Sequence, residues 1–103
     1  MKSKLSLKKA LKKMKALKIQ VFGRVQGVFY RASTKAVADQ IGIKGFVKNL
    51  KDGSVLIEAE GEDFFMNDFL DWCKYGPDDA KVDQTIVEEI EVKNHQNFNI
   101  LKK

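Results

Sequence analysis

The stretch GRVQGVFYR, residues 23–31, combines residue types that could bind an anion. Gly23 and Gly27 permit positive φ angles and a close approach of the backbone to a ligand. Successive backbone N–H groups in such a turn can converge into a concave anion site. The stretch leads into a helical pattern whose N-terminus also favours an anion, and Arg31 adds a planar set of donors that matches phosphate or carboxylate. The expected ligand is a phosphate or a group of similar shape.

The same stretch differs from two widespread phosphate-binding motifs. It is not followed by the Gly-Lys-Ser/Thr of a P-loop, and it lacks the third glycine of the dinucleotide-binding motif. A Gly-x-x-x-Gly turn before a helix is also common as a connection that binds no ligand. An arginine in a first helical turn is often a surface charge. The residues by themselves leave both interpretations open.

Hydrophobic periodicity predicts an element on each side of this stretch. Residues 17–22 alternate apolar and polar side chains, which indicates a half-buried strand. Helical spacing follows, and Gly42 supplies a natural helix end. One face of this helix is expected to carry Thr34, Val37, Ala38 and Ile41. The stretch therefore connects a strand to a helix N-terminus.

The rest of the chain predicts a hairpin, a second helix and further strands. Residues 44–50 and 54–60 are expected to form the hairpin, because the Asp-Gly pair between them favours a tight turn. The second helix is expected to start near Asp63 as its capping residue and to stop at Gly76-Pro77. Its apolar stripe is expected to comprise Phe65, Phe69, Trp72 and Cys73. A long strand is expected where four apolar residues share one parity, Val82, Ile86, Ile90 and Val92, and a short one at residues 98–101.

The order of strand, helix, strand, strand, helix and strand predicts an α+β fold. This order is that of the ferredoxin-like split βαβ sandwich (βαββαβ). Two helices are expected to cover one face of a mainly antiparallel sheet of four to five strands.

The net charge of +5 is unevenly distributed along the chain. Residues 1–18 hold eight lysines and no acidic residue, whereas residues 19–103 hold 11 basic and 14 acidic residues, a net charge of −3. Residues 1–16 are therefore interpreted as a basic N-terminal extension that is expected to be flexible, and residues 17–103 as one domain. A basic amphipathic helix in the extension, and translation that starts at Met14, are alternatives.

The single cysteine and the single histidine argue against thiol chemistry and against a metal site. Cys73 lies in an apolar helical pattern and is expected to be a buried, inert thiol, because one cysteine forms neither an internal disulfide nor a cysteine-based zinc site. His95, the only histidine, is expected to be solvent-exposed in a polar turn that offers too few metal ligands. No apolar stretch approaches the ~18 residues of a membrane span. No metal site is expected from these residues, and the cytoplasm is the expected compartment.

A resemblance to the acylphosphatase family extends over about residues 17–101. It includes GRVQGV with the pair Tyr30-Arg31, GFVKN, DGSV, Glu60-Gly61, WCKYGP and FNI. The resemblance implies a ferredoxin-like fold and hydrolysis of the carboxyl-phosphate bond of acyl phosphates, without metal or cofactor. The departures are small, since Tyr30 stands where Phe is common and Asp78 where Pro is common.

The resemblance also implies a role for each site residue. Arg31 would bind the phosphoryl oxygens, and Asn49, at the end of a strand, would orient the water that attacks directly. Taken alone, Asn49 would be interpreted as an amide in a turn. Backbone N–H groups of the loop would hold the phosphoryl oxygens, and the residues implied are Arg24, Val25, Gln26, Gly27, Val28, Phe29 and Tyr30.

Two other functions are alternatives. A domain of the same family could be non-catalytic and bind acyl phosphate or phosphate in a regulatory role, like the domains fused to enzymes that handle carbamoyl phosphate. RNA-recognition domains share the order of elements, but the base-stacking aromatic of their later motif is missing and residues 19–103 are acidic. The expected partner is therefore a small-molecule acyl phosphate, with no nucleic acid, no stable membrane association and a monomeric chain.

Overall fold

The computed structural model describes residues 13–102, so that most of the predicted basic extension lies outside the described residues. Two helices and five strands follow one another in the predicted order. They are β1 (Met14–Arg24), α2 (Tyr30–Ile41), β2 (Lys44–Asn49), β3 (Val55–Glu62), α3 (Asp63–Tyr75), β4 (Lys81–Ile90) and β5 (Phe98–Leu101). Within residues 13–102, neither helix is long and apolar enough to cross a membrane.

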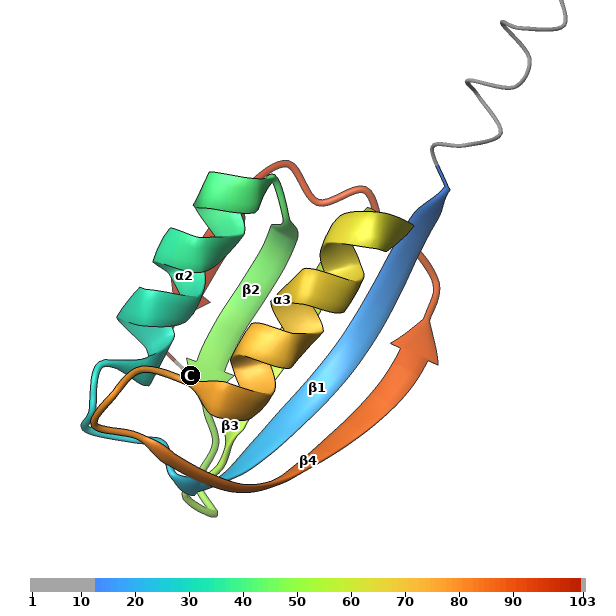
Figure 1. The fold of residues 1–103 in the computed structure, drawn as a ribbon. Helices are drawn as coiled ribbons and strands as arrows, with labels where there is room; N and C mark the ends of the chain where they lie inside the picture. Colours follow the sequence, from blue (N-terminus) through green and yellow to red (C-terminus); the bar gives the residue numbers. More distant parts are fainter. Residues whose placement is uncertain (1–12, 103) are drawn as a thin grey trace, which may run out of the picture.

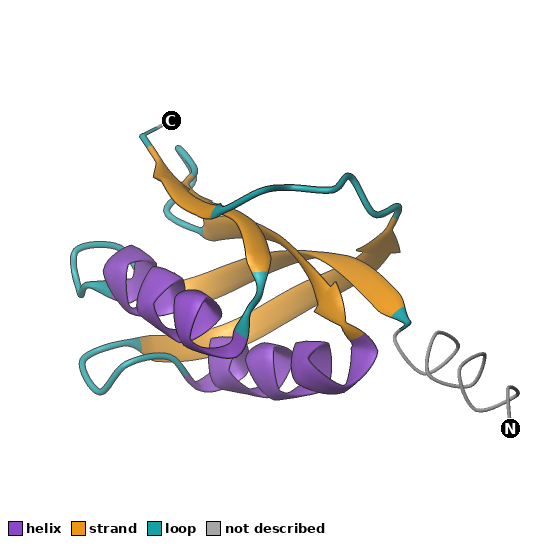
Figure 2. Cartoon of the chain, turned by 90° about the horizontal axis from the view of Figure 1, so that it is seen from above, coloured by secondary structure: helices purple, strands orange, loops and turns teal. Residues whose placement is uncertain are grey.

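The five strands form one mixed sheet in the order β4-β1-β3-β2-β5. β1 pairs antiparallel with both β3 and β4, and β2 pairs antiparallel with β3, whereas β5 runs parallel to β2. Each helix connects two parallel strands that flank a third strand, and both helices cover the same face of the sheet (Figure 1 and Figure 2). The predicted ferredoxin-like sandwich is confirmed.

The hydrophobic core lies between the helices and the covered face of the sheet. Ile19 and Val21 of β1 and Ile57 of β3 are fully buried there, as the alternation of apolar residues predicted. The helices add the buried residues Tyr30, Thr34, Ala38, Met66, Phe69 and Cys73. The core therefore fixes the position of α2, whose first turn follows the glycine-containing stretch.

The predicted apolar stripe of α3 was wrong at Phe65. Met66, Phe69 and Cys73 are spaced three and four residues apart and point at the sheet. Phe65 precedes this face by one position, is 38 % exposed, and packs edge-on against the ring of Phe64. The helical rotation of about 100° per residue moves Phe65 off the buried face.

The start of α3 also differs from the prediction. Asp63 is the first helical residue, Glu62 occupies the capping position, and no side chain caps the helix. The carboxylate of Asp63 lies 3.1 Å from the ammonium of Lys15, and its backbone N–H donates to the carbonyl of Lys13. These contacts accompany a β1 strand that begins at Met14, three residues before the predicted strand.

β4 contains a bulge that the apolar alternation did not reveal. The register between β1 and β4 shifts at Gly23, where Asp83 is left without a partner in β1. Val82 therefore packs against the core, whereas Ile86 lies on the uncovered face and is 50 % exposed. The prediction that these two residues share a face was wrong. β4 also ends at Ile90, before Val92, which was predicted to belong to the strand.

Candidate active site

The loop of residues 25–29 joins β1 to α2 and turns sharply twice. Gly27 has a φ of 77° and Phe29 a φ of 61°, both in the left-handed region. A Cβ atom at Gly27 would meet no atom within 4 Å, so that the positive φ, rather than lack of space, favours glycine there. Turns of this kind direct successive N–H groups toward one side and can form an anion site.

Gly23 has a different role from the one expected. A Cβ atom at this residue would lie 2.1 Å from the carbonyl oxygen of Lys81. Gly23 therefore permits the close approach of β4 at the bulge, not the approach of a ligand. This glycine does not line the pocket described next.

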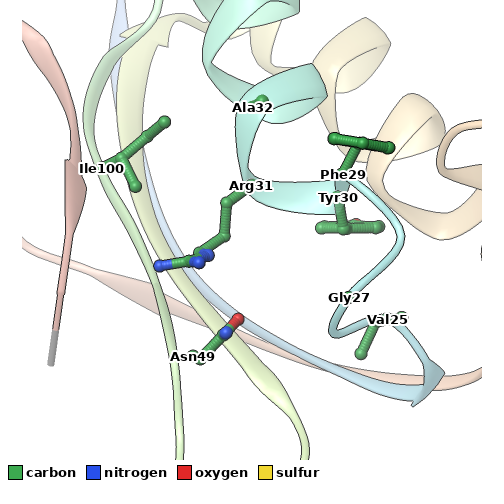
Figure 3. Close-up of a pocket in the computed structure, with 8 residues that line it drawn as sticks. All are labelled: Val25, Gly27, Phe29, Tyr30, Arg31, Ala32, Asn49 and Ile100. Atoms are coloured by element: carbon green, nitrogen blue, oxygen red, sulfur yellow. The ribbon is translucent and has the colours of Figure 1, made fainter.

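A pocket of about 310 Å³ lies where this loop, the first turn of α2, the end of β2 and β5 meet (Figure 3). Its lining residues are Val25, Gly27, Phe29, Tyr30, Arg31, Ala32, Asn49 and Ile100. Three further residues of the predicted site do not line it. Arg24 is exposed at the end of β1, Val28 packs against the core, and the side chain of Gln26 turns toward the β2–β3 hairpin.

The side chains of Arg31 and Asn49 point toward each other in the pocket (Figure 3). Arg31 is the second residue of α2, and its Nη1 lies 3.5 Å from the carbonyl oxygen of Leu101. It forms no ion pair with any residue between 13 and 102. Asn49 is the last residue of β2, and its Oδ1 is buried without a hydrogen-bond partner among the same residues. Among residues 13–102, the pocket thus combines a guanidinium that has no ion-pair partner with an acceptor that has no donor.

The N-terminus of α2 opens onto the same pocket. The first hydrogen bond of the helix runs from the N–H of Ser33 to the carbonyl of Phe29. The N–H groups of residues 30–32 lie before this bond and therefore have no acceptor within the helix. No acidic side chain occupies the first turn. These N–H groups and the helix dipole favour an anion near Arg31.

Gln26 attaches the loop to the hairpin between β2 and β3. Its Nε2 donates to the carbonyl oxygens of Leu50 and Ser54, both at 2.9 Å. Leu50 follows Asn49 directly, and Ser54 precedes Val55, the partner of Asn49 in the sheet. The side chain of Gln26 therefore sets the position of the loop relative to Asn49.

Ser54 stabilises this hairpin from within. It is 1 % exposed, and its hydroxyl accepts a hydrogen bond from Nε2 of Gln20 at 2.9 Å. The hydroxyl and backbone N–H of Ser54 both donate to Oδ1 of Asp52. These hydrogen bonds to the ionised form hold the pKa of the Asp52 carboxyl below its ordinary value.

Two lining residues were not predicted as part of the site. Ala32 lies in the first turn of α2, and the start of the helical pattern could have indicated it. Ile100 comes from β5, where it is paired with Val47 in the parallel β2–β5 ladder. Nothing in the local sequence around Ile100 indicates this neighbour, because only the order of strands brings β5 beside β2.

The two residues singled out for metal or thiol chemistry lie outside the pocket. Cys73 is buried as predicted, and burial raises the pKa of its thiol above the ordinary value. The side chain of His95 is 28 % exposed rather than fully solvent-exposed, and its backbone N–H donates to the carboxylate of Glu60 at 2.6 Å. Residues 13–102 contain no group of three or more His, Cys, Asp or Glu placed to hold a metal ion.

The family model named Acylphosphatase matches residues 17–100. The chain belongs to the acylphosphatase family. An acylphosphatase of Lactiplantibacillus plantarum is 47 % identical over 88 residues, which are 84 % of this chain and 98 % of that protein. The crystal structure of the acylphosphatase from Bacillus subtilis matches with a TM-score of 0.82 at 36 % identity and covers 86 % of this chain and 99 % of that one.

A longer protein contains a similar domain. The crystal structure of HypF from T. kodakarensis matches with a TM-score of 0.76 at 31 % identity, covering 86 % of this chain but 12 % of that one. The acylphosphatase resemblance expected from the sequence motifs is confirmed. The chain is thereby assigned to an enzyme family of hydrolases that act on acyl phosphates.

Proposed function

We propose that this acylphosphatase hydrolyses acyl phosphates in the pocket between the loop of residues 25–29, Arg31 and Asn49. The observation that carries the proposal is the buried Oδ1 of Asn49, which has no hydrogen-bond partner among the described residues and faces the guanidinium of Arg31. A water that donates to this oxygen would be close to a phosphoryl group held by Arg31.

The phosphoryl group binds through its oxygens to the guanidinium of Arg31 and to backbone N–H groups of the loop. The planar donor set of Arg31 can bind two oxygens at once, and the start of α2 adds further positive potential. Charge moves from the phosphoryl group to the leaving carboxylate during the reaction. Donors that are already in place stabilise this redistribution without reorganisation.

Asn49 positions the nucleophile. The oxygen of the bound water attacks phosphorus while the bond between phosphorus and the acyl oxygen breaks, and the electron pair of that bond stays on the carboxylate. An acyl phosphate dianion and water thus give a carboxylate and dihydrogen phosphate. Positioning and charge stabilisation account for most catalysis of phosphoryl transfer, and a carboxylate leaves without a strong general acid. No step is assigned to a metal ion.

Phosphate release from benzoyl phosphate in the presence of a chelator tests this function. We expect full turnover with the chelator and competitive inhibition by inorganic phosphate, because phosphate occupies the same donors. Activity that disappears with the chelator and returns with a divalent cation would contradict the proposed site. Inhibition by phosphate that is not competitive would contradict the assignment of the pocket.

We also propose that the enzyme acts as a monomer in the cytoplasm and without a nucleic-acid partner. The pocket is built from one chain, so that no second subunit is required to complete it. The net charge of −3 over residues 19–103 opposes contact with nucleic-acid phosphates. The buried free thiol of Cys73 is typical of proteins in a reducing compartment.

A further inference from the structure

We propose that Phe29 forms the acyl-group subsite of this pocket and that the enzyme favours acyl phosphates whose acyl group is apolar. This inference rests on the proposed function and adds the class of acyl group to it. It follows from the backbone and exposure of Phe29, from the geometry of attack at phosphorus, and from the residues on one side of the pocket.

Phe29 combines an unusual backbone with an unusual side chain. Its φ of 61° and ψ of 23° lie in the left-handed region, at the capping position of α2. Glycine adopts this conformation at no steric cost, whereas a bulky residue rarely does. The phenyl ring is 77 % exposed, so that core packing does not account for it. Strained residues of this kind cluster at ligand-binding sites, which points to a ligand contact for the ring.

The geometry of the reaction places the acyl group on a particular side of the pocket. The attacking and leaving oxygens lie roughly in line on opposite sides of the phosphoryl group. Because Asn49 holds the water, the acyl group extends away from Asn49. Figure 3 shows Phe29 and Asn49 on opposite sides of the pocket, with the guanidinium of Arg31 on the side of Asn49. The acyl group is therefore directed toward Phe29.

The groups available on this side are apolar. Phe29 and Ala32 line this side, whereas the partly exposed Ile100 lines the pocket from β5, on the far side of Arg31 (Figure 3). An apolar acyl group gains free energy by removing its surface and that of the ring from water. A carboxylate-bearing acyl group would lose hydration there without gaining a charged partner.

Two lysines close to Asn49 in the sequence line a different hollow. Lys48 and Lys51 contribute to a second hollow of about 420 Å³, which has Asn49 as the one lining residue that it shares with the first. These cations are thus adjacent to the water side of the reaction rather than to Phe29. They do not supply the positive charge that an anionic acyl group would need beside the phenyl ring.

The test compares kcat/KM of the wild type and of Phe29→Ala with benzoyl phosphate and with acetyl phosphate. We expect a loss of roughly 3- to 10-fold with benzoyl phosphate, the range typical of one aromatic contact, and a clearly smaller loss with acetyl phosphate. Phe29→Leu should retain most of the activity on benzoyl phosphate. Phe29→Asn, which tolerates the left-handed backbone, should reproduce the loss without added strain.

Phe64→Ala is the matched control. Phe64 is an exposed phenylalanine on α3, 69 % accessible, that does not line the pocket, and its replacement should not change the ratio between the substrates. The inhibition constant of inorganic phosphate, measured for each folded variant, should be unchanged by the loss of the Phe29 ring.

Three outcomes would overturn the inference. Equal losses on both substrates, together with weaker inhibition by phosphate, would mean that Phe29 shapes the phosphate loop and does not contact the acyl group. A wild-type preference for succinyl phosphate over benzoyl phosphate would indicate a charged subsite instead. A wild type that hydrolyses none of the three substrates would refute the proposed function itself, which distinguishes the two failures.

Discussion

Arg31 and Asn49 are held by different elements and are expected to act at different stages of the reaction. Arg31 extends from the first turn of α2, has no ion-pair partner among the described residues, and can bind phosphate before, during and after bond cleavage. Asn49 ends β2, and in the proposed mechanism it acts on phosphorus only through the water that it orients. Substitutions at the two residues should therefore affect binding and turnover differently.

Replacing Arg31 with Ala should reduce both turnover and phosphate binding. By analogy with arginines that stabilise phosphoryl transfer, we expect a rate loss of about 10³-fold or more, with a raised inhibition constant for inorganic phosphate. Arg31→Lys should restore little, because a point charge does not reproduce the planar donor set. Steady-state kinetics with benzoyl phosphate, at several phosphate concentrations, measures both quantities. Normal affinity for phosphate in Arg31→Ala would rule out the role given to Arg31.

Replacing Asn49 with Ala should instead reduce turnover alone. Loss of one oriented polar group typically costs about 10²–10³-fold in kcat. The inhibition constant of phosphate should stay close to that of the wild type, because the donors that bind phosphate are intact. The same kinetic experiment decides the matter. Near-normal turnover in a folded Asn49→Ala variant would show that the water is oriented by another group.

Between elements, the side chain of Gln26 connects the loop of residues 25–29 to the β2–β3 hairpin. The two hydrogen bonds of Gln26 reach the backbone on both sides of the turn that follows Asn49. Both acceptor carbonyls also accept a backbone hydrogen bond, from Gly53 in one case and from Leu50 in the other. Loss of the Gln26 amide would therefore leave the hairpin folded while freeing the loop from it.

We predict that Gln26→Ala lowers kcat by about 10-fold or more, because small displacements of catalytic groups are costly. The free energy of unfolding should fall by only about 1–2 kcal/mol, as for other lost hydrogen bonds. Gln96→Ala is the control, since its amide also donates to a backbone carbonyl, that of Asn94, but lies on an exposed segment away from the pocket. Urea unfolding and kinetics would test both. A loss of stability without any loss of kcat would mean that Gln26 is only structural.

On the scale of the whole molecule, the two helices are joined near the end of the sheet where the pocket lies. The hydroxyl of Tyr30, at the start of α2, donates to the carbonyl of Cys73 in α3 at 2.6 Å. Its ring also packs against Trp72, with ring centroids 5.6 Å apart. Burial raises the pKa of Tyr30 above 10.0 and that of the Cys73 thiol above 9.0, so that both stay protonated in the folded protein.

Because of this burial, the free energy of unfolding should depend on pH in the alkaline range. The unfolded chain loses protons from Cys73 and Tyr30 as pH rises through about 9 and 10, whereas the folded chain keeps them. Stability is thus fully present below pH 9 and should decrease above it, by up to about 1.4 kcal/mol per pH unit for each group. Urea unfolding between pH 8 and 11 measures this dependence. Cys73→Ala and Tyr30→Phe should each flatten it, and a stability independent of pH in the wild type would refute the explanation.

Much of the fold could be predicted because each element depends on local patterns. Three such patterns depend on neighbours within a few residues: the alternation in residues 17–22, the helical spacing before Gly42 and the Asp-Gly turn. The elements that they predict were all found in the structure. The motif of residues 23–31 and Asn49 likewise indicated the family, which is confirmed, and the anion site at this motif stays a prediction. Apart from Phe65, the failures occurred where one element contacts another, as at the bulge of Asp83, where the approach of β4 to Gly23 reverses the face of the strand.

For the site, the sequence by itself determined which residue types are available: a glycine-containing loop, an arginine at a helix start and an asparagine at a strand end. Only the tertiary structure decided how they face one another, because the order of strands places β2 and β5 beside the start of α2. That order adds Ile100 to the pocket and leaves Oδ1 of Asn49 without a hydrogen-bond partner among residues 13–102. It also turns Gln26 toward the hairpin, since hydrogen-bond acceptors 24 and 28 residues away in the chain come within 2.9 Å only after folding.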